Sequence, residues 1–113
     1  MSDDRLYLIH MQECMQRILD YTKDGRQQFM QSTLIQDAVL RNLQTMAESS
    51  QRLSIDLKEA RPEIEWRRLS GFRNVLVHEY LGIDLKTVWQ LVEDELPKLL
   101  QQIESMLSDL NEN

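Results

Sequence analysis

The chain has 113 residues and a net charge of −6, with 42% hydrophobic residues, 3 Gly, 2 Pro and 1 Cys, which indicates a single helical globular domain over residues 1–113 rather than a disordered chain. Its lone cysteine, Cys14, excludes an internal disulfide and a cysteine-rich zinc site. The longest apolar run, Leu6–Ile9, is far too short for a membrane helix, and no signal peptide is recognisable, so we expect a cytoplasmic protein in a reducing compartment.

Two amphipathic helices are predicted in the first half of the chain. The first covers about residues 4–22, and its apolar stripe consists of Leu8, Met11, Met15 and Ile18. The second covers about residues 33–53, and its stripe consists of Ile35, Val39, Leu43 and Met46. Ser32 or Thr33 is a suitable N-cap for this second helix, with Gln36 as the partner in a capping box.

Two further helices are predicted in the second half. The third opens at Pro62, whose missing N–H costs nothing in a first turn, and it runs to about residues 77–78. The fourth opens at Asp84, a strong N-cap, and keeps a three-four rhythm of apolar residues as far as Leu110. Pro97 interrupts this rhythm and is expected to bend the helix, because it removes one backbone hydrogen bond.

The four helices, joined by short connections, predict an all-α fold of the up-down four-helix bundle type. An extra short helix is allowed for at about residues 26–31. The larger aromatic side chains are expected in the core or at an interface, and these are Phe29, Trp66, Phe72 and Trp89.

The negative net charge at first argues against nucleic acid as a partner. The acid excess lies mainly in residues 81–113, which hold seven acids and two bases, whereas residues 1–80 hold twelve acids and eleven bases. Four arginines fall close together in the chain, namely Arg61, Arg67, Arg68 and Arg73. By charge alone, a solvated helix face with ordinary surface charges is the favoured interpretation of this cluster.

The segment Arg73–Tyr80, which reads Arg-Asn-Val-Leu-Val-His-Glu-Tyr, brings together several groups that can do chemistry. On a helix, Asn74 and His78 share a face, and Arg73 flanks that face. A histidine titrates near neutral pH and can move a proton to or from a reacting oxygen. Arginine can hold two phosphate oxygens, and asparagine can orient the imidazole or donate to phosphate. The set is suited to metal-free cleavage of RNA, in which the 2′-hydroxyl attacks phosphorus.

Simpler interpretations exist for the same residues. His78 can be a capping or packed histidine at a helix end, and Arg73 can pair with an acid such as Glu48 or Glu79. Tyr80 can be an ordinary helix-end aromatic residue whose hydroxyl finds a hydrogen bond. Spacing alone therefore makes an arginine and a histidine at this separation a weak signal of catalysis.

A second pair of reactive side chains lies on the first helix. His10 and Cys14 stand one helical turn apart, and Arg17 follows about one turn later. Zinc requires three or four ligands, and no third one is nearby in the sequence. We therefore expect a packed cysteine beside a surface histidine, and neither a metal nor a cofactor.

At Arg73, His78 and Tyr80 the chain resembles the HepT toxins of the HEPN superfamily, whose signature is Arg-x4-His-x-Tyr. The resemblance covers nearly the whole chain: residues 36–43 are similar to the family's second helix, and the region from Trp66 to the motif is similar to its third. Residues 47–49 read Ala-Glu-Ser where the family often has Gly-Glu-Ala. Because the glutamate, Glu48, matches at this position, we include it as a supporting residue of the site.

The resemblance implies a metal-independent endoribonuclease that works as a homodimer, with the motifs of two copies facing each other. Arg73, Asn74 and His78 are then the catalytic residues, and RNA rather than DNA or a membrane is the expected partner. The family's usual second partner is an MntA-like nucleotidyltransferase antitoxin that attaches AMP to the tyrosine of the motif, here Tyr80. The chain would then be the toxin of a type VII-like toxin–antitoxin pair.

Two other functions stay open on the sequence. The chain can be a non-catalytic helical dimer that serves as the nucleotide- or substrate-binding partner of a nucleotidyltransferase. It can also be a purely structural helical dimer, although the motif would then be a coincidence, which the breadth of the resemblance disfavours.

Overall fold

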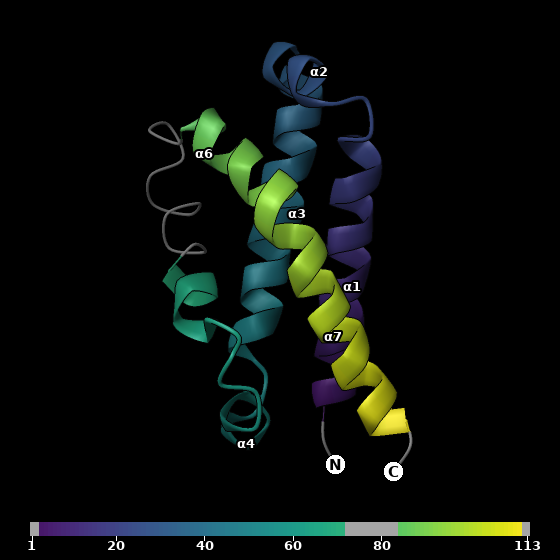
Figure 1. The fold of residues 1–113 in the computed structure, drawn as a ribbon, viewed down its shortest axis with the longest axis vertical. Helices are drawn as coiled ribbons and strands as arrows, with labels where there is room; N and C mark the ends of the chain where they lie inside the picture. The colour runs from purple at the N-terminus through teal and green to yellow at the C-terminus, as the bar shows by residue number, and fades with distance from the viewer. Residues whose placement is uncertain (1–2, 72–83, 112–113) are drawn as a thin grey trace.

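The computed structural model describes residues 3–71 and 84–111, and every regular element within these two ranges is helical (Figure 1). The elements are α1 (Asp4–Tyr21), α2 (Arg26–Gln31), α3 (Thr33–Gln51), α4 (Ile55–Glu59), a helical stretch at residues 66–71, α6 (Leu85–Gln90), the π-helical turn η2 (Leu91–Glu95) and α7 (Leu96–Asn111). The predicted all-α class is therefore confirmed for this part of the chain. None of the helices within the two ranges is long and apolar enough to cross a membrane.

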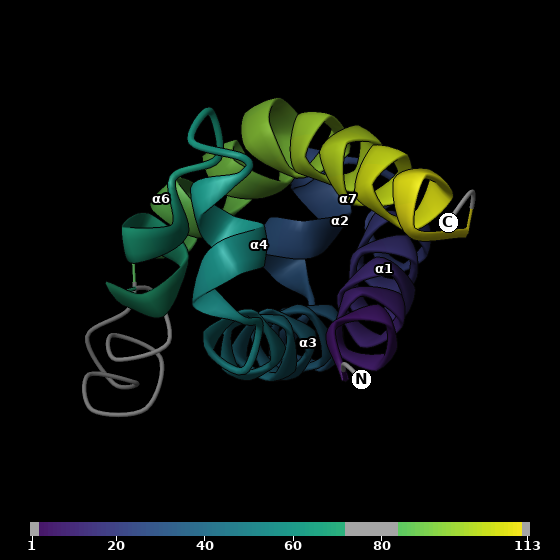
Figure 2. The same ribbon diagram turned by 90° about the horizontal axis from the view of Figure 1, so that it is seen from below.

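The three long helices α1, α3 and α7 form the body of the molecule (Figures 1 and 2). α1 and α3 run in opposite directions and pack against each other, and α7 packs against α1. α2 covers one end of this body, and α4 lies at the other end. The third helix of the predicted bundle is described only at residues 66–71, so the complete four-helix arrangement stays a prediction.

The interior is built from the apolar stripes predicted at three- and four-residue spacing. The fully buried side chains include Leu8, Met11, Met15 and Ile18 from α1, Val39, Leu43 and Met46 from α3, and Leu96, Ile103 and Met106 from α7. Burial of one such side chain stabilises the folded state by about 1.5–3 kcal/mol relative to leaving it exposed. This cluster is therefore the main favourable contribution to folding.

Helix α2 confirms the extra short helix expected at about residues 26–31, and Phe29 anchors it. The Phe29 side chain has no exposed surface, and its ring centroid lies 5.5 Å from that of Trp89. Trp66 packs against the same core and is partly buried, whereas Phe72 lies outside the described residues. Three of the four aromatic residues therefore pack as predicted.

The connection between α2 and α3 is held by two polar side chains. Ser32 caps α3 as predicted, because its hydroxyl accepts a hydrogen bond from the N–H of Ile35 (3.1 Å). Gln36 does not complete the predicted capping box. Its side-chain amide donates to the carbonyl oxygens of Phe29 (2.9 Å) and Met30 (3.2 Å), so it joins the end of α2 to the start of α3.

Helix α4 was not among the predicted elements. Its N-cap is Ser54, whose hydroxyl accepts a hydrogen bond from the N–H of Leu57 (3.2 Å). The buried carboxylate of Asp4 accepts hydrogen bonds from the N–H of Ser54 (2.8 Å) and from its hydroxyl (2.7 Å). These bonds attach the start of α4 to the first turn of α1.

The two ends of the described chain lie beside each other. The Arg5 side chain in α1 donates from Nε to the Oδ1 atom of Asn111, the last residue of α7, over 3.1 Å. Both termini are at the end of the molecule where α4 lies, opposite α2 (Figure 1).

The third predicted helix begins later than expected. Residues 61–65 form turns and irregular backbone, and helical geometry starts at residue 66. The indole N–H of Trp66 donates to the carbonyl oxygens of Lys58 (3.2 Å) and Arg61 (3.1 Å), which folds the preceding loop back onto it. Pro62 therefore lies in a turn, and the prediction that it opens the helix is wrong. The predicted end of this helix lies outside the described residues.

The fourth predicted helix is confirmed from its cap to its end. The carboxylate of Asp84 accepts hydrogen bonds from the N–H of Lys86 (3.0 Å) and from the hydroxyl of Thr87 (3.1 Å). The helix then continues through α6, η2 and α7 to Asn111. The prediction of Asp84 as the N-cap of this helix is therefore confirmed.

A π-helical turn, η2, interrupts this helix just before Pro97. Pro97 lacks the N–H that would bond to the carbonyl of Glu93 in an α-helix, so regular α-helical bonding fails at this point. Three buried side chains before Pro97 stand at four-residue intervals, namely Val88, Val92 and Leu96. On an α-helix, side chains at this spacing turn by about 40° around the helix axis at each step, and the wider π turn offsets this rotation, so that all three face the core. A π turn therefore precedes Pro97, and the bend predicted at Pro97 stays a prediction.

Replacement of Phe29 by alanine should lower the free energy of unfolding by about 3–5 kcal/mol, because it opens a cavity at the contact between α2 and Trp89. Urea unfolding followed by circular dichroism measures this change. Leu34→Ala is the matched control, since Leu34 is 80% exposed and its loss should change stability by less than about 0.5 kcal/mol. Equal effects of the two substitutions would contradict the assignment of Phe29 to the core.

Candidate functional site

The residues predicted to cut RNA, Arg73, Asn74 and His78, lie outside the described residues, and so does Tyr80. The chain on both sides of them is described, up to residue 71 and from residue 84. Glu48 lies in the last turn of α3 and is half-buried. The arrangement of the motif residues relative to one another therefore stays a prediction. The described residues show the surroundings of the two segments that flank the motif.

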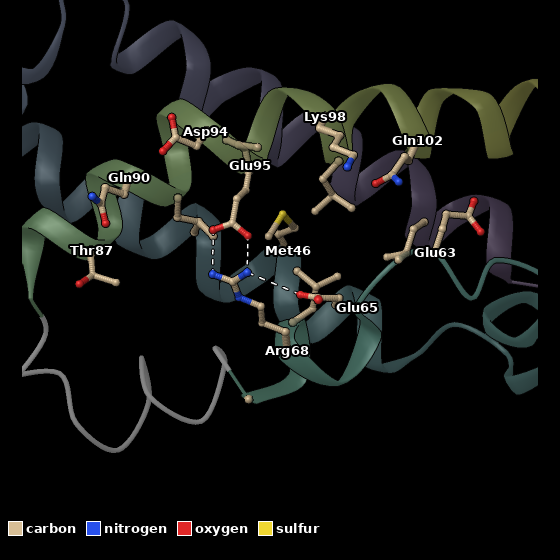
Figure 3. Close-up of a pocket in the computed structure, with 16 residues that line it drawn as sticks. Met46, Glu63, Glu65, Arg68, Thr87, Gln90, Asp94, Glu95, Lys98 and Gln102 are labelled. Carbon is tan, nitrogen blue, oxygen red and sulfur yellow. Dashed lines mark hydrogen bonds and ion pairs between the residues drawn. The ribbon is translucent and has the colours of Figure 1, made fainter.

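A groove with a volume of about 870 Å³ opens between the two described segments that flank the motif (Figure 3). One wall is formed by residues 63–71, and the other by α6, η2 and the first two turns of α7. Its apolar lining consists of Met46, Ile64, Leu69, Leu91, Leu96 and Leu99. A concave apolar surface of this size is the kind of place where ligands bind, so the charges around it decide which ligand fits.

The rim of this groove carries more acid than base. Its carboxylates are Glu63, Glu65, Asp94 and Glu95, and its cations are Arg68 and Lys98. Phosphate groups bind where positive charge is in excess, because their affinity depends on neutralisation by Lys and Arg. The described walls of the groove are therefore poorly suited to hold an RNA backbone.

One cation of the rim, Arg68, is already engaged by acids. Its Nη2 donates to Oε2 of Glu95 over 2.7 Å, while Nη1 pairs with the other oxygen of the same carboxylate. Nη1 also lies 3.5 Å from the carboxylate of Glu65 (Figure 3). Sequence patterns did not predict the pair with Glu95, because the two residues are 27 positions apart and belong to different predicted helices.

A second arginine of the cluster, Arg61, also makes ion pairs within the chain. Its guanidinium pairs with Asp109 in α7 and lies 3.7 Å from the carboxylate of Glu63. Arg67 is exposed and forms no ion pair with any residue in the two described ranges. The interpretation of the cluster as ordinary surface charge therefore holds for Arg67, whereas Arg61 connects separate segments of the fold.

The thiol of Cys14 is buried and the side chain of His10 is exposed, as predicted for the first helix. Burial raises the pKa of the Cys14 thiol, and the nearby Arg17 guanidinium offsets only part of this rise. Arg17 itself lies 3.6 Å from the carboxylate of Glu13. Over residues 3–71 and 84–111, no three His, Cys, Asp or Glu side chains are grouped so that they could hold a metal ion.

Comparison with known families gives one match that spans most of the chain. The sequence profile described as "Ribonuclease HepT-like" matches residues 11–106, a range that includes all of the predicted catalytic residues and Tyr80. No solved structure matches the chain. The match is therefore one of sequence, and it extends over the described helices as well as the motif.

Several curated proteins are similar to this chain over most of its length. A protein of Methanocaldococcus jannaschii named as a "Putative RNase" is 31% identical over 103 residues, which are 90% of this chain and 94% of that protein. The "Probable ribonuclease HepT" of Thermococcus cleftensis is 31% identical over 101 residues, covering 88% of this chain and 92% of the relative. Another M. jannaschii protein, named as a "Gamma-glutamylcyclotransferase and putative RNase", is 32% identical over 113 residues, and the chain spans about half (51%) of its length.

Cys14 should react slowly with a thiol reagent in the folded protein. Its side chain is only 3% exposed, and its raised pKa lowers the fraction of reactive thiolate at neutral pH. Alkylation by iodoacetamide, followed by intact-mass measurement at pH 7 with and without urea, checks this. Modification that is as fast without urea as with it would contradict the buried position of the thiol.

Proposed function

The chain belongs to the HepT-like ribonuclease family, and we propose that it is a metal-independent endoribonuclease in which Arg73, Asn74 and His78 carry out the cleavage. The observation that carries the proposal is the family match over residues 11–106, within which this chain keeps the complete Arg-x4-His-x-Tyr motif. The relatives that match almost end to end carry RNase names, which supports the same activity.

The proposed reaction is an attack of the RNA 2′-hydroxyl on the adjacent phosphorus. The hydroxyl loses a proton as its oxygen bonds to phosphorus, and the 5′-oxygen gains a proton as its bond to phosphorus breaks. His78 serves one of these proton transfers, because imidazole exchanges protons near neutral pH. Arg73 stabilises the negative charge on the phosphate oxygens, and Asn74 orients the imidazole or donates to phosphate. Glu48 is proposed as a supporting residue from α3.

A homodimer supplies the second proton-transfer group. The chain contains two histidines, and the other one, His10, is exposed on α1. Because one reaction requires both a base and an acid, we propose that the motifs of two copies face each other and contribute one His78 each. The acid-rich walls of the groove favour this arrangement, since two copies of Arg73 would then supply positive charge that the described walls lack.

The proposed physiological role is that of the toxin in a toxin–antitoxin pair. An MntA-like nucleotidyltransferase would silence the enzyme by modifying Tyr80. In that step the tyrosine oxygen attacks the α-phosphorus of ATP, pyrophosphate leaves, and the hydroxyl proton passes to a base of the transferase. The added phosphate brings negative charge two residues from His78, where it would compete with RNA for Arg73.

The substitution His78→Ala should lower the rate of RNA cleavage by about 10²–10⁴-fold, because it removes the general acid–base group. The purified protein and the variant are incubated with total RNA, and the products are separated by gel electrophoresis. His10→Ala is the matched control and should cleave at the parental rate, since His10 lies exposed on α1. Addition of EDTA should leave the rate unchanged.

Three results would count against this proposal. Equal cleavage by the parent and by His78→Ala would remove His78 from the mechanism. Loss of cleavage with EDTA would contradict a metal-free reaction. Tight binding of a nucleotidyltransferase without any RNA turnover by the parent would favour the non-catalytic binding partner instead.

The substitution Tyr80→Phe should leave RNA cleavage close to the parental rate but abolish silencing by the antitoxin, because the oxygen that accepts AMP is gone. Each protein is incubated with an MntA-like nucleotidyltransferase and ATP, and AMP addition is followed by intact mass before the RNA assay. If Tyr80→Phe still gains AMP, the modified residue lies elsewhere in the chain.

A further inference from the structure

Two described elements flank the segment that carries the motif, and a single ion pair connects them. The helical residues 66–71 precede the segment, and α6 with η2 follows it. Arg68 extends from the first element and Glu95 from the second, and Figure 3 shows the two side chains meeting across the groove. Arg68 is also five positions before Arg73 in the sequence.

The contact between Arg68 and Glu95 fixes the orientation of the two side-chain groups as well as the distance between them. Both terminal nitrogens of Arg68 engage both oxygens of Glu95, and the Nη2–Oε2 distance is 2.7 Å. A two-point contact between planar groups restricts rotation more than a single hydrogen bond does. Glu65, which directly precedes this helical stretch, supports the guanidinium with an Nη1–Oε2 distance of 3.5 Å.

Glu95 reaches Arg68 from the last position of the π-helical turn η2. Each residue turns an α-helix by about 100°, so a shift of register by one residue would point the side chain of position 95 to another side. π turns of this kind occur frequently next to functional sites. The next residue, Leu96, is 1% exposed, which holds the backbone at Glu95 against the core.

The pair is too exposed to be explained by global stability. The side chains of Arg68 and Glu95 are 58% and 42% exposed. Ion pairs at such positions contribute little to the free energy of unfolding. A local role, in which the pair fixes the spacing of the two flanking elements, agrees better with its two-point geometry.

We propose that Arg68 and Glu95 are positioning residues for RNA cleavage, a role that rests on the function proposed above. Their ion pair fixes the spacing between the two elements that hold the ends of the motif segment, so Arg73 and His78 occupy the reactive arrangement for a larger share of the time. Catalysis is sensitive to such placement, because small displacements of a catalytic group lower the rate strongly. The pair should therefore affect kcat more than KM.

The test compares charge reversals with matched controls. Arg68→Glu and Glu95→Arg should each lower kcat for RNA cleavage by up to about fivefold, the factor expected for losing an exposed pair of good geometry, with little change in KM. The double variant, which restores opposite charges in the reversed order, should recover most of kcat. Arg67→Glu introduces the same charge as Arg68→Glu at a neighbouring exposed position outside the groove, and it should leave kcat near the parental value.

A second measurement does not depend on activity. Hydrogen–deuterium exchange of peptides that cover residues 72–83 should be faster in Arg68→Glu than in the parent and in Arg67→Glu. Unchanged exchange together with unchanged kcat would overturn the positioning role, and so would a double variant that stays as slow as the single ones. If the parent cuts no RNA but exchange at residues 72–83 is still faster in Arg68→Glu, the proposed ribonuclease function fails. The ion pair would then fix the spacing of the two flanking elements without a role in RNA cleavage.

Discussion

The packing of α1 against α3 is the contact on which the other elements depend. Each helix places apolar side chains at three- and four-residue spacing along one face, and these faces close on each other. α7 lies on α1, α2 is joined to the start of α3 through Gln36, and α4 is joined to α1 through Asp4 and Ser54. The elements that flank the motif are attached to this same body, so its packing sets where the motif segment begins and ends.

Charge limits how this fold can handle RNA. Arg61 and Arg68 are engaged by acids of the chain, and the groove beside the motif carries four carboxylates against two cations. The described surface beside the motif therefore offers an RNA backbone no excess of positive charge. In the proposed mechanism the phosphate is therefore held by the catalytic arginines themselves, which explains why one modification at Tyr80 would be enough to block the site.

Local patterns predicted most of the fold, and contacts between distant residues account for what they missed. The stripes of α1, α3 and α7, the caps Ser32 and Asp84, and the short helix α2 follow from the spacing of neighbouring residues. The late start of the third helix depends on bonds from Trp66 to an earlier loop, and the pair of Arg68 with Glu95 spans 27 residues. For the site, the motif and the family match name the residues, while their geometry stays a prediction because it depends on how distant segments of the chain pack around residues that lie outside the described ranges.

The hydrogen bond between Arg5 and Asn111 has a practical consequence for how this fold can be joined to others. Adjacent ends allow a chain to be reconnected in a new order, with fresh termini opened in a surface loop. The turn between α1 and α2, at the opposite pole of the molecule, is a suitable place for such a cut. A module joined before α1 and a module joined after α7 would both leave from the same pole and lie close to each other, while the α2 pole stayed accessible.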